Sequence, residues 1–423
     1  MRRATADDRG PTALRLLLLA VLLLACRESN SQPKIIPIWT AGQTPLIRVR
    51  LCDSAPHCEI AAEGSYRLEA DAESVTPVSG QRLDAARIAP ASNDGPGFEL
   101  LGRVWSGRHL RLCPEPAGTV RLRLPDREAW NVYEGTMDFH ISDEGLIEVI
   151  NTLDVETYLV SVIANEMPAS FQPEALRAQA IVARTYALYH CQTTGATRAW
   201  DVRATERSQV YRGRSDMAAE SETRAAVEAT RGVVCTWDGA SGRKIFCTYY
   251  SSTCGGCTQP ASNIAPRSTE APLAGSVRCE YCNDSPAFRW GPTVVSKTLM
   301  LESLRKRCEE FGDFDAITTV AIAEYAECRR AARIAVTDGS GRTVTLGAER
   351  FRLAVDPTGT EIRSTLFELV VEPDSIVFAN GRGYGHGVGL CQWGTERLAR
   401  MGWSAGQILA YYYPGSQITL AYP

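Results

Sequence analysis

Residues 155–168 read VETYLVSVIANEMP, and this stretch decides how the middle of the chain folds. From Val155 to Glu166 the side chains of one face recur at intervals of four, three and four positions, which is the period of an α-helix. Asp154 suits the cap of the first turn, and Pro168 ends the helix because the residue before a proline avoids helical geometry. The pattern predicts a helix that carries a carboxylate on its apolar face.

Glu166 is an unusual residue at this position because two effects act against its charge. Removal from water disfavours the ionised carboxylate, and so does the negative end of the helix dipole. Both effects raise the pKa, which is the property that a general acid needs near neutral pH. The alternative is a structural role, in which a partly exposed Glu166 pairs with an arginine at a frayed helix end.

The overall composition indicates a soluble globular protein of two or three domains. The chain has 423 residues, of which 44% are hydrophobic and 22% charged, and its net charge is −4. A net negative charge gives no reason to expect a basic surface, so nucleic acid is not an expected partner. Residues 46–138 alternate apolar and polar positions, as β-strands do, and helical periods follow. The expected class is therefore α+β.

The expected organisation has four parts. Residues 1–25 are a signal segment, 26–45 a tether, 46–138 a β-rich domain, and 139–420 a second domain with a Cys-rich insertion at 253–298. In the second domain helical patterns cover 155–166, 173–191, 218–231, 298–312, 395–401 and 404–412, and strand patterns cover 317–378.

The N-terminus predicts export. Four arginines precede or enter the run LLLLAVLLLA (16–25), which is too short to span a bilayer. The run ends in LLAC, which resembles the lipobox of bacterial lipoproteins and makes Cys26 the expected lipidation site. A plain secretory signal with an incidental cysteine is the alternative. The first interpretation places the protein at the cell envelope, held on a membrane by its lipid.

Two cysteine pairs form the pattern C-x2-C-x21-C-x2-C: Cys254, Cys257, Cys279 and Cys282. Four thiolates at this spacing are typical of a tetrahedral zinc site. An exported protein also favours two disulfides, and the sequence leaves both alternatives open.

A glycine-rich loop stands near the C-terminus, where GRGYGHGVGLCQWG (381–394) alternates glycine with other residues. It has neither the dinucleotide-binding nor the P-loop pattern. Alternating glycines allow the backbone to approach a neighbour closely. His386 lies in the middle of this loop, where it is either structural or functional.

Taken together, these motifs resemble the SpoIID/LytB family, that of stage II sporulation protein D. The resemblance covers about residues 140–420 and rests on VETYLVSVIANEMPASFQPEALRAQAIVARTYAL (155–188), SQVYRG (208–213), TYYSSTCGG (248–256) and the glycine-rich loop with GWSAGQILAYYYPG (402–415) after it. It implies a SpoIID-like fold and a lytic transglycosylase acting on peptidoglycan glycan strands from which an amidase has removed the peptides. A non-catalytic protein that binds glycan and enhances an amidase is the alternative.

The resemblance also implies roles for individual residues. The glutamate of the family's E-M-P motif is the catalytic acid, which is Glu166 here. Seven further positions are expected to line or support the substrate site: Gln179, Arg184, Tyr186, Tyr250, Ser251, His386 and Gln392. Some members hold zinc through Cys and His after the strand that matches TYYSS. This chain has no His there, so a site of four cysteines is the expected form.

Overall fold

The computed structural model describes residues 44–71, 77–91, 95–214, 217–240 and 242–423. Helices and strands both build the chain, so the predicted α+β class is confirmed. The expected signal segment, Cys26 and all but the last two residues of the tether lie outside the described residues. Within these ranges no helix is long and apolar enough to cross a membrane.

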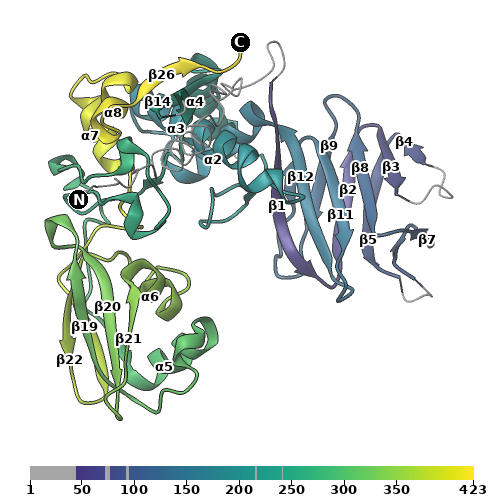
Figure 1. Ribbon diagram of the computed structural model, residues 1–423. Helices are drawn as coiled ribbons and strands as arrows, with labels where there is room; N and C mark the ends of the chain where they lie inside the picture. The colour runs from purple at the N-terminus through teal and green to yellow at the C-terminus, as the bar shows by residue number, and fades with distance from the viewer. Residues whose placement is uncertain (1–43, 72–76, 92–94, 215–216, 241) are drawn as a thin grey trace, which may run out of the picture.

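The N-terminal part consists of two β-sheets that enclose one hydrophobic core (Figure 1). The first sheet has seven strands in the order β13-β1-β12-β11-β8-β3-β4, and the second has six in the order β10-β9-β2-β5-β6-β7. Large side chains such as Phe98, Trp105 and Phe139 are fully buried between them. The strands are β1 Leu46–Ala55, β2 Cys58–Glu63, β3 Tyr66–Ala70, β4 Val78–Gly80, β5 Leu83–Pro90, β6 Gly97–Leu100, β7 Arg103–Ser106, β8 His109–Pro114, β9 Thr119–Arg123, β10 Asn131–Tyr133, β11 Thr136–Ile141, β12 Ile147–Asp154 and β13 Val202–Arg203.

The seven-stranded sheet extends past the expected domain boundary. Strand β12 pairs with β1 on one side and with β11 on the other, and its last residue, Asp154, caps helix α2 (Val155–Glu166). The expected boundary between residues 138 and 139 therefore falls inside a sheet. Strand patterning alone does not reveal which strands pair, so it does not locate this boundary.

A layer of helices lies beside the first sheet, and α3 is at its centre (Figure 1). Its buried alanines allow α2, α4, α7 and α8 to pack closely around it. The helix predictions in this layer are confirmed, with α2 at Val155–Glu166, α3 at Pro173–Gln192, α4 at Met217–Ala229, α7 at Gln392–Arg400 and α8 at Ala405–Tyr412. A small sheet joins this layer to the C-terminus, in the order β15-β14-β26, formed by Gly242–Ile245, Val233–Gly239 and Gln417–Leu420.

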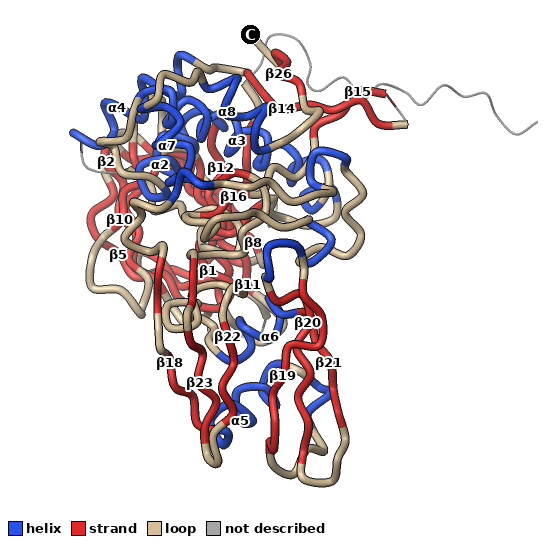
Figure 2. The backbone as a smooth tube through the Cα atoms, turned by 90° about the vertical axis from the view of Figure 1, so that its left-hand side faces the viewer, coloured by secondary structure: helices blue, strands red, loops and turns tan. Residues whose placement is uncertain are grey.

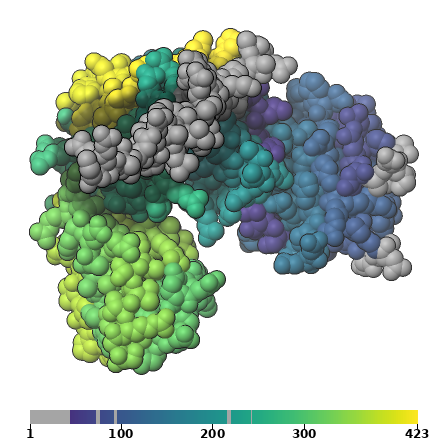
Figure 3. Space-filling view, in the orientation of Figure 1, coloured from purple at the N-terminus to yellow at the C-terminus, as the bar shows by residue number. Residues whose placement is uncertain are grey.

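The segment from Trp290 to Phe378 forms a lobe with its own hydrophobic cluster. Two three-stranded sheets, β18-β23-β22 and β19-β20-β21, lie side by side in it (Figure 2), and Figure 3 shows the lobe projecting below the helical layer. We call it the inserted lobe. Its elements are β18 Thr293–Ser296, α5 Lys297–Arg307, β19 Ile317–Tyr325, β20 Ala331–Asp338, β21 Thr343–Gly347, α6 Ala348–Val355, β22 Glu368–Val371 and β23 Ser375–Ala379.

One prediction for this lobe is wrong, because α6 lies within residues 317–378, where only strands were expected. Its residues Ala348, Phe351 and Ala354 are buried at helical intervals. The apolar run is too short for periodicity to distinguish a helix from a strand.

Two very short strand pairs attach the glycine-rich loop to the rest of the chain. Strand β16 (Tyr250–Ser251) runs parallel to β25 (Leu390–Cys391), and β17 (Arg289–Trp290) is antiparallel to β24 (Gly381–Arg382). These pairs fix both ends of the loop.

Candidate active site and cysteine cluster

Glu166 is the last residue of α2, where two hydrogen-bond donors reach its carboxylate and the Tyr250 hydroxyl lies nearby. Oε1 accepts a hydrogen bond from the Val210 backbone N–H at 2.9 Å, and Oε2 accepts one from Nε2 of Gln392 at 3.5 Å. Burial raises the pKa of Glu166 above its ordinary value, although the hydrogen bonds from Val210, Gln392 and Tyr250 partly oppose this rise. The carboxyl group is thus biased toward its protonated form and remains partly open to solvent.

The hydroxyl of Tyr250 is oriented by a fully buried glutamine, Gln209. Nε2 of Gln209 donates to the Ala183 carbonyl oxygen at 3.3 Å and to the Tyr250 hydroxyl oxygen at 3.2 Å, while Oε1 accepts from the Tyr158 hydroxyl at 3.0 Å. Because the Tyr250 oxygen already accepts a hydrogen bond, its own proton is left for Glu166. Gln209 was not among the predicted site residues, although it lies within the quoted stretch SQVYRG.

Tyr186 and His386 shape the surroundings of Tyr250. The Tyr186 ring packs edge-on against Tyr249 and Tyr250, with ring centroids 6.3 and 6.4 Å apart. Nδ1 of His386 accepts the Val388 backbone N–H at 3.0 Å, so this ring holds the glycine-rich loop in shape. Burial lowers the pKa of His386 to about 4, which leaves the imidazole neutral at neutral pH.

Three other predicted site residues are buried below the surface. Arg184 is fully enclosed and pairs with Glu156 through hydrogen bonds of 2.9 and 2.7 Å, so of the two expected roles, lining or supporting the substrate site, only support is open to it. Gln179 and Ser251 are also buried, and neither amide atom of Gln179 nor Oγ of Ser251 has a hydrogen-bond partner within the described part of the chain. Among the seven predicted positions, Gln392 hydrogen-bonds Glu166, and the hydroxyl of Tyr250 is close enough to lower its pKa.

Glycines allow the glycine-rich loop to lie directly on the strand that carries Tyr250. Gly389 has a positive φ of 69°, and a Cβ atom there would come within 2.0 Å of the Tyr249 carbonyl oxygen. Gly383 also has a positive φ, of 85°, and a Cβ atom there would meet the Thr253 carbonyl oxygen at 2.6 Å. Only glycine fits such contacts without strain. The close approach brings Gln392 to Glu166.

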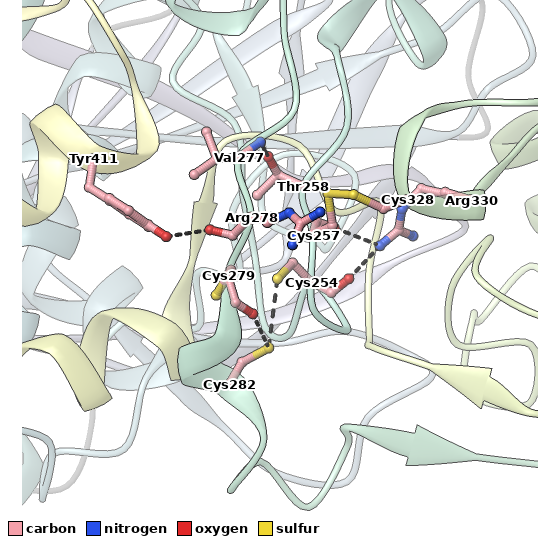
Figure 4. Close-up of a disulfide and its surroundings, with 10 residues drawn as sticks. All are labelled: Cys254, Cys257, Thr258, Val277, Arg278, Cys279, Cys282, Cys328, Arg330 and Tyr411. Atoms are coloured by element: carbon pink, nitrogen blue, oxygen red, sulfur yellow. Dashed lines mark hydrogen bonds between the residues drawn. A yellow bond between two sulfur atoms is a disulfide. The ribbon is translucent and has the colours of Figure 1, made fainter.

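Four buried cysteines meet next to this loop, and the set differs from the predicted one by one residue. The sulfur atoms of Cys254, Cys279, Cys282 and Cys391 all lie within 4.8 Å of one another. We call this group the cysteine cluster. The prediction for Cys257 is corrected, because its sulfur forms a disulfide with Cys328 of the inserted lobe (Figure 4).

The local backbone explains why the cluster contains Cys391 and not the predicted Cys257. Gly255 and Gly256 both have positive φ, and the tight turn they form directs Cys254 and Cys257 to different neighbours. The parallel pairing of β16 with β25 then brings Cys391 to the cluster, where its sulfur accepts the Cys254 backbone N–H at 3.2 Å. No local sequence signal marks Cys391 as a partner of the other three cysteines.

The cluster has the dimensions of a four-thiolate metal site. A tetrahedral zinc ion with Zn–S bonds of about 2.3 Å separates its sulfur atoms by about 3.8 Å. Sulfur atoms of Cys254 and Cys282 are 3.6 Å apart, and the hydroxyl of Tyr412 lies 3.1 Å from the sulfur of Cys279. Hydrogen bonds among the four thiols lower the pKa of Cys279 and of Cys282, whereas hydrogen bonds from thiols raise the pKa of Cys254 and burial raises that of Cys391. A metal needs all four as thiolates, so the distances between the sulfur atoms carry the interpretation.

Comparisons with known proteins show which families the chain is similar to. Residues 143–237, which include Glu166, match the family described as stage II sporulation protein, and residues 273–389 match a domain of unknown function (DUF8618). An uncharacterized protein of Brachyspira hyodysenteriae is 30% identical over 287 residues, which cover 68% of this chain and 72% of that protein.

Two relatives from Bacillus subtilis carry functional names. The amidase enhancer is 29% identical over 350 residues, which cover 74% of this chain and 47% of that protein. Stage II sporulation protein D is 28% identical over 284 residues, which cover 64% of this chain and 76% of that protein. The chain therefore spans about half the length of the amidase enhancer.

The burial of Glu166 predicts a pH-dependent change in stability. In the folded chain the pKa of this carboxyl group is raised, and unfolding returns it to about 4.3. The folded state then binds the proton more tightly than the unfolded state does. The free energy of unfolding therefore falls as pH rises from the ordinary pKa of glutamate to the raised pKa of Glu166, and is constant above it. We expect Glu166→Gln to raise the melting temperature by a few degrees at neutral pH, and this gain to vanish below about pH 4.

Melting curves followed by circular dichroism across this pH range make the measurement. Glu144→Gln is the matched control, because Glu144 is exposed in the turn between β11 and β12. A gain in melting temperature that is the same at every pH would contradict the raised pKa of Glu166.

Proposed function

The chain belongs to the SpoIID family, that of stage II sporulation protein D, and on this premise we propose that it is a cell-wall enzyme, a peptidoglycan lytic transglycosylase. Its proposed substrates are glycan strands from which an amidase has removed the stem peptides. The observation that carries this proposal is the geometry of Glu166, a carboxyl group with a raised pKa and a fixed set of hydrogen-bond donors.

In the proposed mechanism Glu166 acts first as an acid and then as a base. Its protonated carboxyl group gives the proton to the glycosidic oxygen between N-acetylmuramic acid and N-acetylglucosamine. The O6 hydroxyl of the muramic acid then attacks C1, and the bond from C1 to the glycosidic oxygen breaks, so N-acetylglucosamine leaves as an alcohol that carries the donated proton. The O6 proton passes to the carboxylate, and the enzyme returns to its starting form. A 1,6-anhydro end results, and no second carboxylate is required, unlike in most glycosidases.

The neighbours of Glu166 support the proposal that this one residue acts as both proton donor and proton acceptor. Burial favours the protonated form before the reaction, and the Val210 N–H, Gln392 and Tyr250 stabilise the carboxylate once the proton has left. These opposing influences bring the two protonation states closer in free energy, as acid–base catalysis near neutral pH requires.

Digestion of peptide-denuded glycan strands tests this mechanism. We expect the wild-type chain to release products with anhydro ends, identified by mass spectrometry, and Glu166→Gln to lower the rate by about 10²- to 10⁴-fold. Glu144→Gln is the control for loss of a surface carboxylate, and it should cleave like the wild type. Absence of anhydro products from the wild type, or undiminished cleavage by Glu166→Gln, would overturn the mechanism.

A second candidate function is glycan binding that enhances an amidase without cleavage. The similarity to a protein named amidase enhancer favours this candidate. The same assay separates the two functions when an amidase and intact peptidoglycan are supplied. Under the second candidate the chain accelerates peptide release, Glu166→Gln accelerates it equally, and no anhydro ends form.

We also propose that the protein is exported and held at the cell envelope by lipid on Cys26. The support is the arginine-bearing N-terminus, the short apolar run and LLAC at 23–26. Labelled palmitate should enter the wild-type chain in a bacterial host that processes lipoproteins. Cys26→Ser should take up no label, and equal labelling of both chains would refute the anchor.

The cysteine cluster is proposed to hold one zinc ion through Cys254, Cys279, Cys282 and Cys391. The support is the mutual approach of four buried sulfur atoms within 4.8 Å. Four thiolates leave no open position, so the ion would have a structural role, holding the Cys-rich segment and the end of the glycine-rich loop together.

Metal analysis of protein purified without added zinc tests this site. We expect one zinc per wild-type chain, and loss of zinc with a lower melting temperature in Cys391→Ser. Cys257→Ser is the matched control, since Cys257 lies in the disulfide with Cys328, and this variant should keep its zinc. A wild-type chain without metal, whose four cluster cysteines are joined as disulfides, would contradict the proposal.

A further inference from the structure

A group of arginines surrounds one buried tryptophan at the edge of the seven-stranded sheet. The guanidinium carbons of Arg50, Arg198 and Arg203 lie 4.4, 4.8 and 5.2 Å from the centre of the Trp200 ring. Trp200 is only 8% exposed, so the ring supports the guanidinium groups and does not itself offer a face to a sugar. We call these three residues and Arg207 the arginine cluster.

The positive charge of this cluster is only partly balanced by the protein. Arg50 lies directly across from Arg203 in the parallel pairing of β1 with β13, and like charges in that position are destabilising. Arg50 has two acidic partners, Glu148 at 3.1 Å and Asp53 at 3.7 Å, and the charge of Asp53 also acts on Arg203. Within the described residues Arg198, Arg203 and Arg207 form no ion pair with a carboxylate.

The surrounding sequence has the same excess of positive charge. Residues 198–214 contain five arginines and two acidic residues, a net charge of +3 in a chain whose net charge is −4. Burial lowers the pKa of Arg203, and the charges of Arg50 and Arg207 lower it further. Such mutual repulsion is relieved when an anion binds, which indicates a ligand.

The arginine cluster is connected to Glu166 by one short loop. The Ala204 N–H donates to the Arg50 carbonyl oxygen at 3.1 Å, and the Tyr211 N–H donates to the Ala204 carbonyl oxygen at 3.3 Å. Val210, which precedes Tyr211, donates its N–H to Glu166. These contacts place the backbone of Arg203, which precedes Ala204, within about 10 Å of the backbone that holds the carboxylate. In Figure 1, β1 is correspondingly the labelled strand of this sheet nearest to the helical layer.

We propose that the arginine cluster binds the carboxylates of the glycan strand on which Glu166 acts. The inference rests on the proposed function, because removal of the stem peptide leaves a free carboxylate on the lactyl ether of each muramic acid. A guanidinium group matches a carboxylate with two parallel hydrogen bonds. Strands that still carry peptides have an amide in place of this anion, so the cluster selects the product of an amidase.

Binding measurements on the full mature chain test the proposal. Glu166→Gln is used as the background so that strands stay intact, and the probes are denuded strands with free carboxylates and the same strands after conversion of the carboxylates to methylamides. We expect free-acid strands to bind more tightly, by a margin that shrinks as salt is added. Arg198→Gln with Arg203→Gln should weaken free-acid binding about tenfold and leave methylamide binding unchanged.

Two further variants serve as controls, one for misfolding and one for a general loss of positive charge. Arg207→Gln changes only an exposed side chain and should reproduce part of the loss with an unchanged melting temperature. Arg82→Gln with Arg307→Gln removes the same charge from exposed positions outside the cluster and should leave binding unchanged.

Three results would overturn the proposal. They are equal binding of free-acid and methylamide strands, an equal loss in the control pair and the cluster variants, and preference for a polyglycerol phosphate over free-acid strands. Failure of the proposed enzymatic function gives a different result from failure of the binding proposal. In that case the wild-type chain would form no anhydro ends from free-acid or methylamide strands, even if the arginine cluster bound free-acid strands more tightly.

Discussion

The site depends on one short parallel pairing, that of β16 with β25. Two residues on each side, Tyr250 with Leu390 and Ser251 with Cys391, join segments that are far apart in the sequence. This pairing places Tyr250 beside Glu166 and Cys391 in the cysteine cluster. So short a contact cannot hold alone, and the glycines of the loop let its backbone lie close enough for the neighbouring backbone hydrogen bonds to form.

Desolvation of Glu166 is the second constraint, and hydrogen-bond donors around the carboxylate partly oppose its effect on the pKa. The apolar side chains of α2 remove water from one side, which favours the neutral carboxyl group. The backbone N–H of Val210 and the chain from Tyr158 through Gln209 to Tyr250 supply fixed donors on the other side. The buried glutamine matters because it determines where the hydroxyl proton of Tyr250 points.

Features encoded locally could be predicted from the sequence, and those that depend on distant contacts could not. The period and caps of α2 and α3 lie within a few residues of one another, so both helices and the position of Glu166 followed from the pattern. Cys391 was missed because only a distant strand pairing brings it to the cluster. The sequence left open whether Arg184 lines or supports the site, because its motif position says nothing about burial, and its pairing with Glu156 depends on the packing of α2 against α3.

The cysteine cluster and the carboxylate are joined through two consecutive residues. Cys391 belongs to the cluster and caps α7, and the next residue, Gln392, reaches Glu166 with its amide. Neighbouring residues on a fixed backbone cannot move independently, so any shift of the cluster changes the distance from Gln392 to the carboxylate. That hydrogen bond lowers the pKa of Glu166. The cysteine cluster is thereby connected, through Gln392, to the acidity of the proposed catalytic group.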